Sequence, residues 1–214
     1  MVSESQMSFT QAVEGRRSVR RYRSDPVPRE DVERMVALAA RAASAGNAQM
    51  WRFIAVQDHE VLQAMKRVVD DRLDEMSAWP ELAAERKAIK AVRAYATFFS
   101  QAPLCFAVLG LPYSSRTDLL LAERGLSREE RDRLRQRPDL QSVGAAVQLL
   151  ITAAHAMGYG SCWMSAPVLA AEGLEAVLGV EPPAQLVAIV PVGRPAGSPR
   201  RSGRLPLDQI LSFR

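Results

Sequence analysis

The sequence predicts an α+β protein in which helices pack around one small, mainly antiparallel sheet. Segments with helical periodicity alternate along the chain with about four short segments that are apolar or rich in β-branched residues. Of the 214 residues, 48% are hydrophobic and 24% are charged, a balance that supports one buried core. We therefore expect a single domain over residues 1–214, with a polar excursion from the core at about 111–138.

Two helices are predicted before the first strand. Ser8 and Gln11 form the signature of a capping box, so a short helix should follow and end near Gly15. Residues 29–43 place their apolar side chains on one stripe at helical spacing, which predicts an amphipathic helix. The small residues of SAGN, 44–47, then form a turn.

The later elements differ in how deeply they should be buried. The wholly apolar segment 103–110 is typical of a strand buried on both faces. A helix capped by Asp139 and ended by Gly158 is apolar nearly all round, so it must lie centrally or in a subunit interface. The remaining elements are expected as strands at 52–57, 160–164 and 185–193, as helices at 59–76, 80–100 and 167–178, and as a last short element in LDQIL.

The charge is basic but does not favour nucleic acid. The net charge is +4 and the pI is near 9.4, yet many of the 25 arginines alternate with acids, as in residues 124–137. No helix-turn-helix, zinc finger or aromatic platform accompanies the charge, so a basic nucleic-acid-binding protein is a distant alternative. A Rossmann or P-loop enzyme is disfavoured because neither GxGxxG nor a P-loop sequence occurs.

Membrane and metal functions are also not indicated. No apolar run approaches the roughly 20 residues of a membrane span, and the N-terminus lacks the features of a signal peptide, so we expect a cytoplasmic protein. Cys105 and Cys162 lie far apart, without a CxxC or a companion histidine cluster, which argues against a zinc site or a disulfide framework. His59 and His155 lack the pattern of a catalytic triad.

The stretch RRSVRRYR packs five arginines into eight positions around a serine. In an extended segment Arg16, Ser18 and Arg20 share one face, and Arg17 lies on the other. Two cations that flank a hydroxyl can form a pocket for a phosphate or another anionic oxygen, because guanidinium binds such groups in a bidentate fork. On spacing alone, a solvated or salt-bridged arginine cluster explains the stretch equally well.

Three segments together resemble the FMN-dependent nitroreductase family. Residues 16–53 contain RRSVR, a helix headed by PVP and the turn SAGNAQMWRF in the order typical of that family. Residues 144–167 are similar to its central helix and the flavin-contact strand that follows, and VAIVPVGRP with SGRLPLDQIL is similar to its C-terminus. The resemblance implies a nitroreductase-like fold and a homodimer with FMN at the subunit interface. It also implies that hydride passes from NADH or NADPH to flavin N5 and then, by a ping-pong route, to a nitroaromatic, a quinone or a similar small electron acceptor.

The resemblance assigns the basic residues to FMN. Arg16 and Ser18 match the positions that contact the phosphate and the ribityl chain, and Arg20 matches the basic position near the pyrimidine edge of the ring. Arg204 matches the C-terminal residue that closes on the phosphate. Arg17 belongs to the same motif and is included in the predicted cofactor site, although its opposite face also suits a salt bridge.

The resemblance also implies a turn through which one subunit reaches the flavin of the other. Ser44, Asn47 and Gln49 match the polar positions of that turn. The sequence departs from the family pattern here, because Ala43 and Met50 stand where prolines are common. Without those prolines we expect a less stiff turn.

A third set matches the strand end that lies against the flavin ring, where a backbone N–H approaches N5: Trp163, Met164, Ser165 and Ala166. Trp163 suits the hydrophobic core equally well. Tyr113 and Arg116 lie in the variable excursion and are candidates for a substrate lid, or else for a plain exposed loop. The alternative function is the same fold with other flavin chemistry, namely dehydrogenation, reductive dehalogenation or flavin-consuming benzimidazole synthesis.

Overall fold

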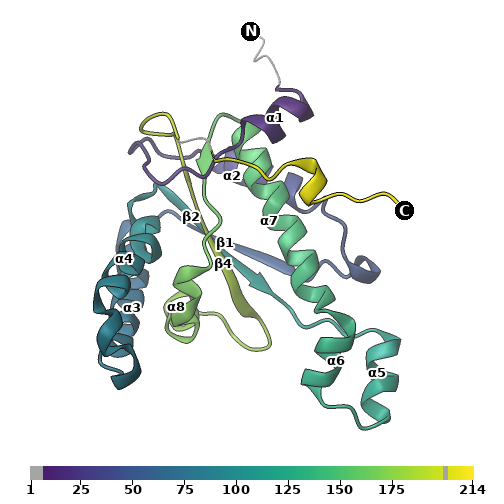
Figure 1. The fold of residues 1–214 in the computed structure, drawn as a ribbon. Helices are drawn as coiled ribbons and strands as arrows, with labels where there is room; N and C mark the ends of the chain where they lie inside the picture. Colours follow the sequence, from purple (N-terminus) through teal and green to yellow (C-terminus); the bar gives the residue numbers. More distant parts are fainter. Residues whose placement is uncertain (1–6, 200–201) are drawn as a thin grey trace.

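The computed structural model describes residues 7–199 and 202–214, and it confirms the α+β class. Helices cover both faces of a four-stranded antiparallel sheet (Figure 1). The strands lie in the order β1-β2-β4-β3 and comprise β1 (Trp51–Val56), β2 (Leu104–Gly110), β3 (Gly160–Ser161) and β4 (Gln185–Gly193). Arg200 and Arg201, which the sequence suggests are solvated, lie outside the described residues.

The α-helices are α1 (Phe9–Gly15), α2 (Arg29–Ala39), α3 (His59–Ser77), α4 (Arg86–Thr97), α5 (Arg116–Glu123), α6 (Arg128–Arg135), α7 (Pro138–Ala156) and α8 (Ala171–Leu178). Short 3-10 segments occur at η1 (Ala45–Asn47), η2 (Pro80–Glu85), η3 (Phe98–Gln101), η4 (Ala166–Ala170) and η5 (Leu207–Gln209). Within the described part of the chain, no helix combines the length and the hydrophobicity that a bilayer crossing requires.

Strand β2 explains how one small sheet carries two hydrophobic layers. Successive side chains of a strand point to opposite faces. Leu104, Phe106 and Val108 therefore pack with α2 and α7, whereas Cys105 and Ala107 pack with α3, α4 and α8. Both faces need apolar residues, which is why this strand forms an uninterrupted apolar run in the sequence.

The central helix α7 begins differently from the expectation. Asp139 is not the cap, because Arg137 occupies the cap position with a left-handed φ of 52°. Asp139 instead accepts two hydrogen bonds from the Arg137 guanidinium, at 3.1 Å from Nε and 2.9 Å from Nη2. The predicted C-terminus is confirmed: Gly158 has a φ of 80°, and the Tyr159 N–H donates to the carbonyl of Ala154 at 2.8 Å.

Other predicted boundaries move for identifiable reasons. The first long helix ends at Ala39 instead of residue 43, since the Ala45 N–H donates to the Ser142 hydroxyl and the chain turns toward α7. The strand predicted at 160–164 pairs regularly only over two residues. The Cys162 N–H reaches the carbonyl of Pro191 at 3.3 Å, but a proline has no N–H to return, so the ladder is interrupted there and resumes only at the bridge between Met164 and Ile189.

The excursion at 111–138 forms a helical hairpin, α5–α6, which projects from one end of α7 (Figure 1). Its base is tied by Asp118, which is buried. The Asp118 carboxylate accepts from the N–H of Ser115 at 2.7 Å and from its hydroxyl at 2.6 Å, and it pairs with Arg135 Nε at 3.2 Å. Arg135 also donates to the Ser115 hydroxyl at 3.1 Å, so one network joins the start of α5 to the end of α6.

This network predicts an acid-sensitive hairpin. The hydrogen bonds from Ser115, and then the charge of Arg135, hold the pKa of Asp118 below its ordinary value. The stabilisation is therefore complete above the ordinary carboxyl pKa of about 4 and is lost as the pH falls through the lowered pKa of the folded state. Asp118→Asn should raise the amide exchange of α5, relative to intrinsic rates, about tenfold at pH 7.

Glu123→Gln is the matched control, because Glu123 is an exposed acid on the same helix. It should leave the exchange of α5 unchanged. Equal exchange in Asp118→Asn and the wild-type protein at pH 7 would show that the network does not hold the hairpin.

Candidate functional site

The segment from Arg16 to Arg20 docks against β3. The Val19 N–H donates to the carbonyl of Ser161 at 2.9 Å, and the Val19 side chain lies on Gly160. The fit leaves no space for a larger residue, since a Cβ at Gly160 would stand 2.5 Å from Val19 Cγ2. Val19 is therefore buried while Ser18 and Arg20 face outward, as the alternation of an extended segment predicts.

Two arginines from opposite ends of the chain meet at this segment. Arg16 is half-buried at the end of α1, and its pKa is lowered first by burial and then by the neighbouring charges of Arg204 and Arg17. Within residues 7–199 and 202–214, no carboxylate lies at ion-pairing distance from Arg16, Arg20 or Arg204. Like charges gathered without a counter-ion favour the binding of an anion.

Arg17 and Arg20 make other contacts. The Arg17 guanidinium donates to the carbonyls of Glu14 at 2.5 Å and Arg16 at 2.7 Å, so it caps the end of α1. The salt bridge suggested for Arg17 is absent among the described residues. The Arg20 guanidinium lies over the ring of Tyr95 on α4, 5.9 Å from its centroid.

Buried polar groups beside the arginines are not evident from the sequence. His155 Nε2 and Ser161 Oγ are buried and have no hydrogen-bond partner among the described residues. Burial and the charges of Arg16 and Arg17 lower the pKa of His155, so its imidazole is neutral at pH 7. Within the described ranges, no group of three or more His, Cys, Asp or Glu is placed to hold a metal ion. The site is therefore cationic and polar.

The turn at residues 44–49 lies elsewhere and is held in an unusual backbone conformation. Gly46, Asn47 and Gln49 have φ values of 58°, 52° and 49°. The Ser44 hydroxyl accepts the N–H of Gln49 at 3.1 Å, and the Gln49 amide lies 3.4 Å from the Asn47 side-chain oxygen. The Ala45 N–H donates to Ser142 on α7 at 3.1 Å. In the absence of the two prolines, these hydrogen bonds hold the turn.

Of the two lid candidates, only Tyr113 contacts this turn. A Cβ at Gly46 would lie 2.9 Å from the Tyr113 hydroxyl oxygen. The neighbouring Leu111 N–H donates to the carbonyl of Met50 at 2.7 Å, so the chain leaving β2 is fastened to the turn. Arg116 is exposed at the start of α5.

The predicted ring-contact residues separate into two groups. Met164 is buried in the core, and both of its backbone groups bond to Ile189, so its N–H is not available to a ligand. Trp163 is 42% exposed and lies against Gly144 of α7. Ser165 is exposed, and Ala166 begins η4. The indole of Trp163 is thus on the surface, and the assignment to the core is wrong.

Helix α7 determines which of these groups can meet. His155 and Gly144 are eleven residues apart, which places them on one face of the helix and about 16 Å apart along it. Arg16 and Trp163 therefore flank the same face of α7. Ser142, which binds the turn, is two residues from Gly144 and so lies on nearly the opposite face. One chain therefore presents residues 16–20, Arg204 and Trp163 on one side of α7 and holds the turn at 44–49 on the other side.

Comparison with known proteins identifies the family of the chain. The model of the Nitroreductase family matches residues 13–194. A 5,6-dimethylbenzimidazole synthase from Rhodospirillum rubrum is 32% identical over 182 residues, covering 84% of this chain and 78% of the relative. An NADH dehydrogenase from Thermus thermophilus is 27% identical over 225 residues, covering 93% and 92%. The crystal structure of a BluB-like flavoprotein from Clostridium difficile 630 superposes with a TM-score of 0.86 at 28% identity, covering 97% and 99%.

The contact between Tyr113 and Gly46 can be tested by substitution. Gly46→Ala should cost about 1 kcal/mol of unfolding free energy for the left-handed backbone and about 1 kcal/mol more for the clash with the hydroxyl. Gly179→Ala is the matched control, because Gly179 has a φ of 64° and a methyl group there would meet no atom within 4 Å. Urea unfolding measures both losses. Equal losses for the two variants, or no recovery in Gly46→Ala with Tyr113→Phe, would contradict the contact.

Proposed function

Because the chain belongs to the nitroreductase family, we propose that it is a flavoenzyme that binds FMN and passes a hydride from NADH or NADPH to a small electrophile such as a nitroaromatic or a quinone. The observation that carries this proposal is the group of arginines beside an exposed serine, with no carboxylate at ion-pairing distance from Arg16 or Arg204 among residues 7–199 and 202–214. A phosphate carries nearly two negative charges at pH 7, so it complements Arg16 and Arg204.

Each residue of this group suits one part of the cofactor. Arg16 and Arg204 would hold the phosphate, and the outward-facing Ser18 hydroxyl would bond to the ribityl chain. Arg20, held over Tyr95, would face the pyrimidine edge and stabilise negative charge there. FMN supplies the hydride chemistry at N5 when it is bound, so the chain itself needs no acid, base or nucleophile. The Trp163 indole would border the ring and exclude water from it.

A second subunit completes this proposed site. The turn at 44–49 lies on the far side of α7 from Arg16 and Trp163, so it would reach the flavin of a partner chain. Several large apolar side chains on α1 and the C-terminal segment are exposed and would be covered in such a homodimer. They are Phe9, Val13, Leu205, Leu207, Ile210, Leu211 and Phe213.

Benzimidazole synthesis is the second candidate function, and specific similarities favour it. The relative with 32% identity is a 5,6-dimethylbenzimidazole synthase, and the structure with the TM-score of 0.86 is described as BluB-like. This function would use the same residues to hold FMN. It differs in consuming the flavin instead of recycling it with NAD(P)H.

Retention of FMN tests the cofactor site. The purified protein should be yellow and release FMN on denaturation. Arg16→Ala and Arg204→Ala should each weaken FMN binding by about tenfold or more, because each removes a charge-assisted hydrogen bond. The affinity for riboflavin, which lacks the phosphate, should fall much less in the same variants. Quenching of flavin fluorescence measures the affinities for FMN and for riboflavin. Arg21→Ala, at an exposed arginine of the same segment, is the control. Colourless protein that does not take up added FMN contradicts the proposal.

The two functions differ in how the flavin is reduced and in its fate. Anaerobic stopped-flow mixing with NADH or NADPH should bleach the flavin band within one turnover if the protein is an NAD(P)H oxidoreductase. Failure of both reductants, together with a benzimidazole product detected by mass spectrometry after the photoreduced protein meets oxygen, would establish the second function instead.

A further inference from the structure

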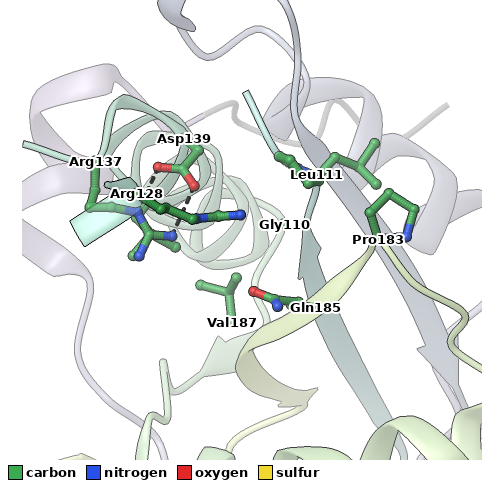
Figure 2. Close-up of a pocket in the computed structure, with 10 residues that line it drawn as sticks. Gly110, Leu111, Arg128, Arg137, Asp139, Pro183, Gln185 and Val187 are labelled. Atoms are coloured by element: carbon green, nitrogen blue, oxygen red, sulfur yellow. Dashed lines mark hydrogen bonds and ion pairs between the residues drawn. The ribbon is translucent and has the colours of Figure 1, made fainter. Parts of the chain in front are cut away.

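A polar cleft lies between the α5–α6 hairpin and the sheet, outside the proposed FMN site. It consists of two adjoining cavities of about 120 Å³ and about 140 Å³, both lined by Pro112, Arg128 and Asp139. The first cavity also contacts the end of β2 and the start of β4. Figure 2 shows Arg128 beside the paired Arg137 and Asp139, with the Gln185 amide across the cavity.

Most of the acidic groups in the cleft are already neutralised. Asp139 is held by the two hydrogen bonds from Arg137. Asp118 is held by Ser115 and Arg135. Among the lining residues of the two cavities, this leaves the charges of Arg128, Arg131 and Asp132.

These three charges are only loosely paired. Asp132 lies 3.7 Å from Arg128 Nε and 3.7 Å from Arg137 Nε, beyond hydrogen-bond distance in both cases. Arg131 donates a single long bond of 3.4 Å, to the Ser127 carbonyl. Beside the paired Arg135 and Arg137, the cleft therefore holds two guanidinium groups, Arg128 and Arg131, that have no hydrogen bond to a described carboxylate. The hydroxyls of Tyr113 and Ser114 and the Gln185 amide add uncharged donors.

We propose that this cleft binds an oxyanion, a carboxylate or phosphate group, on the small molecule that exchanges electrons with the flavin. Arg128 and Arg131 would bind the oxygens, because guanidinium donors match carboxylate and phosphate in a fork geometry. Tyr113 lines the cleft and also contacts the turn at Gly46, so the anionic end of a ligand would lie beside the turn that approaches the flavin. The link to a substrate depends on the flavin function proposed above, whereas anion binding in the cleft does not.

Binding without turnover provides the first test. The thermal unfolding temperature of the FMN-loaded protein is measured at increasing concentrations of sodium phosphate or sodium benzoate. Sodium chloride keeps the ionic strength constant. The anion should stabilise the wild-type protein, and Arg128→Gln and Arg131→Gln should each lower the affinity for the anion about tenfold. Arg133→Gln is the matched control, since Arg133 is an exposed arginine of the same helix that lines neither cavity. Equal stabilisation of all four proteins overturns the proposal.

A second test identifies the ligand. Turnover is measured with 4-nitrobenzoate or the neutral 4-nitrobenzamide as the electron acceptor. Each acceptor is tested with NADH and with NADPH as the reductant. If the acceptor is bound, Arg128→Gln should lower kcat/KM about tenfold for the benzoate and less than about twofold for the benzamide. If the cleft instead binds the phosphates of the nicotinamide cofactor, Arg128→Gln should raise KM for the reductant with either acceptor. Unchanged constants for every substrate overturn the assignment to the electron-exchanging molecule.

The outcome remains distinguishable from failure of the proposed function. If the protein retains no FMN, the thermal titration is repeated in the Arg16→Ala background, which removes the other candidate anion site. Stabilisation by phosphate or benzoate that still requires Arg128 supports the cleft as an anion site, and its absence overturns it.

Discussion

The packing of α7 against the sheet is the constraint on which the site depends. Val143, Val147, Leu150 and Ala154 are buried against β2 and β4, so the helix cannot rotate without exposing core surface. The orientation of its other faces follows from this burial. Gly144 and His155 are presented toward Trp163 and Arg16, and Ser142 is directed to the opposite side. The apolar packing of α7 thus determines where the polar side chains on its other faces, His155 and Ser142, are directed.

The arginine group is unfavourable by itself and becomes favourable with a ligand. Arg16 is partly desolvated and lies near Arg204 and Arg17, and both effects oppose its charge. The folded chain tolerates them because Val19 docks on Gly160 and because Arg17 caps α1. An anion at Arg16 and Arg204 would remove the repulsion and would also stabilise the fold by mass action. Binding of such an anion at Arg16 and Arg204 would therefore couple the stability of the fold to the affinity for the ligand.

Elements whose boundaries depend on local chemistry were predictable from the sequence. The Ser8 capping box, the Gly158 terminus and the strand β2 agree with the structure. Contacts between distant segments were not predictable. The pairing of Asp139 with Arg137, the early end of α2 at the Ser142 contact and the interrupted β3 ladder at Pro191 each depend on a partner that no local pattern identifies. For the same reason the motif indicated Arg16 and Ser18 but not His155 or Ser161.

The proposed FMN site and the proposed anion cleft lie on different segments of the fold. Of the groups assigned to FMN, Arg16, Ser18 and Arg20 lie on a segment bonded to β3, whereas Arg204 lies on the exposed C-terminal segment. The cleft assigned to the anionic end of a substrate lies on the α5–α6 hairpin, which is tied mainly by Asp118 to its own helices and by Tyr113 to the turn. Substitutions of Arg128 or Arg131 would therefore change the ligand of the cleft and leave the docking of residues 16–20 on β3 in place. One fold can in this way support different reactions, because function depends on the site and not on the fold alone.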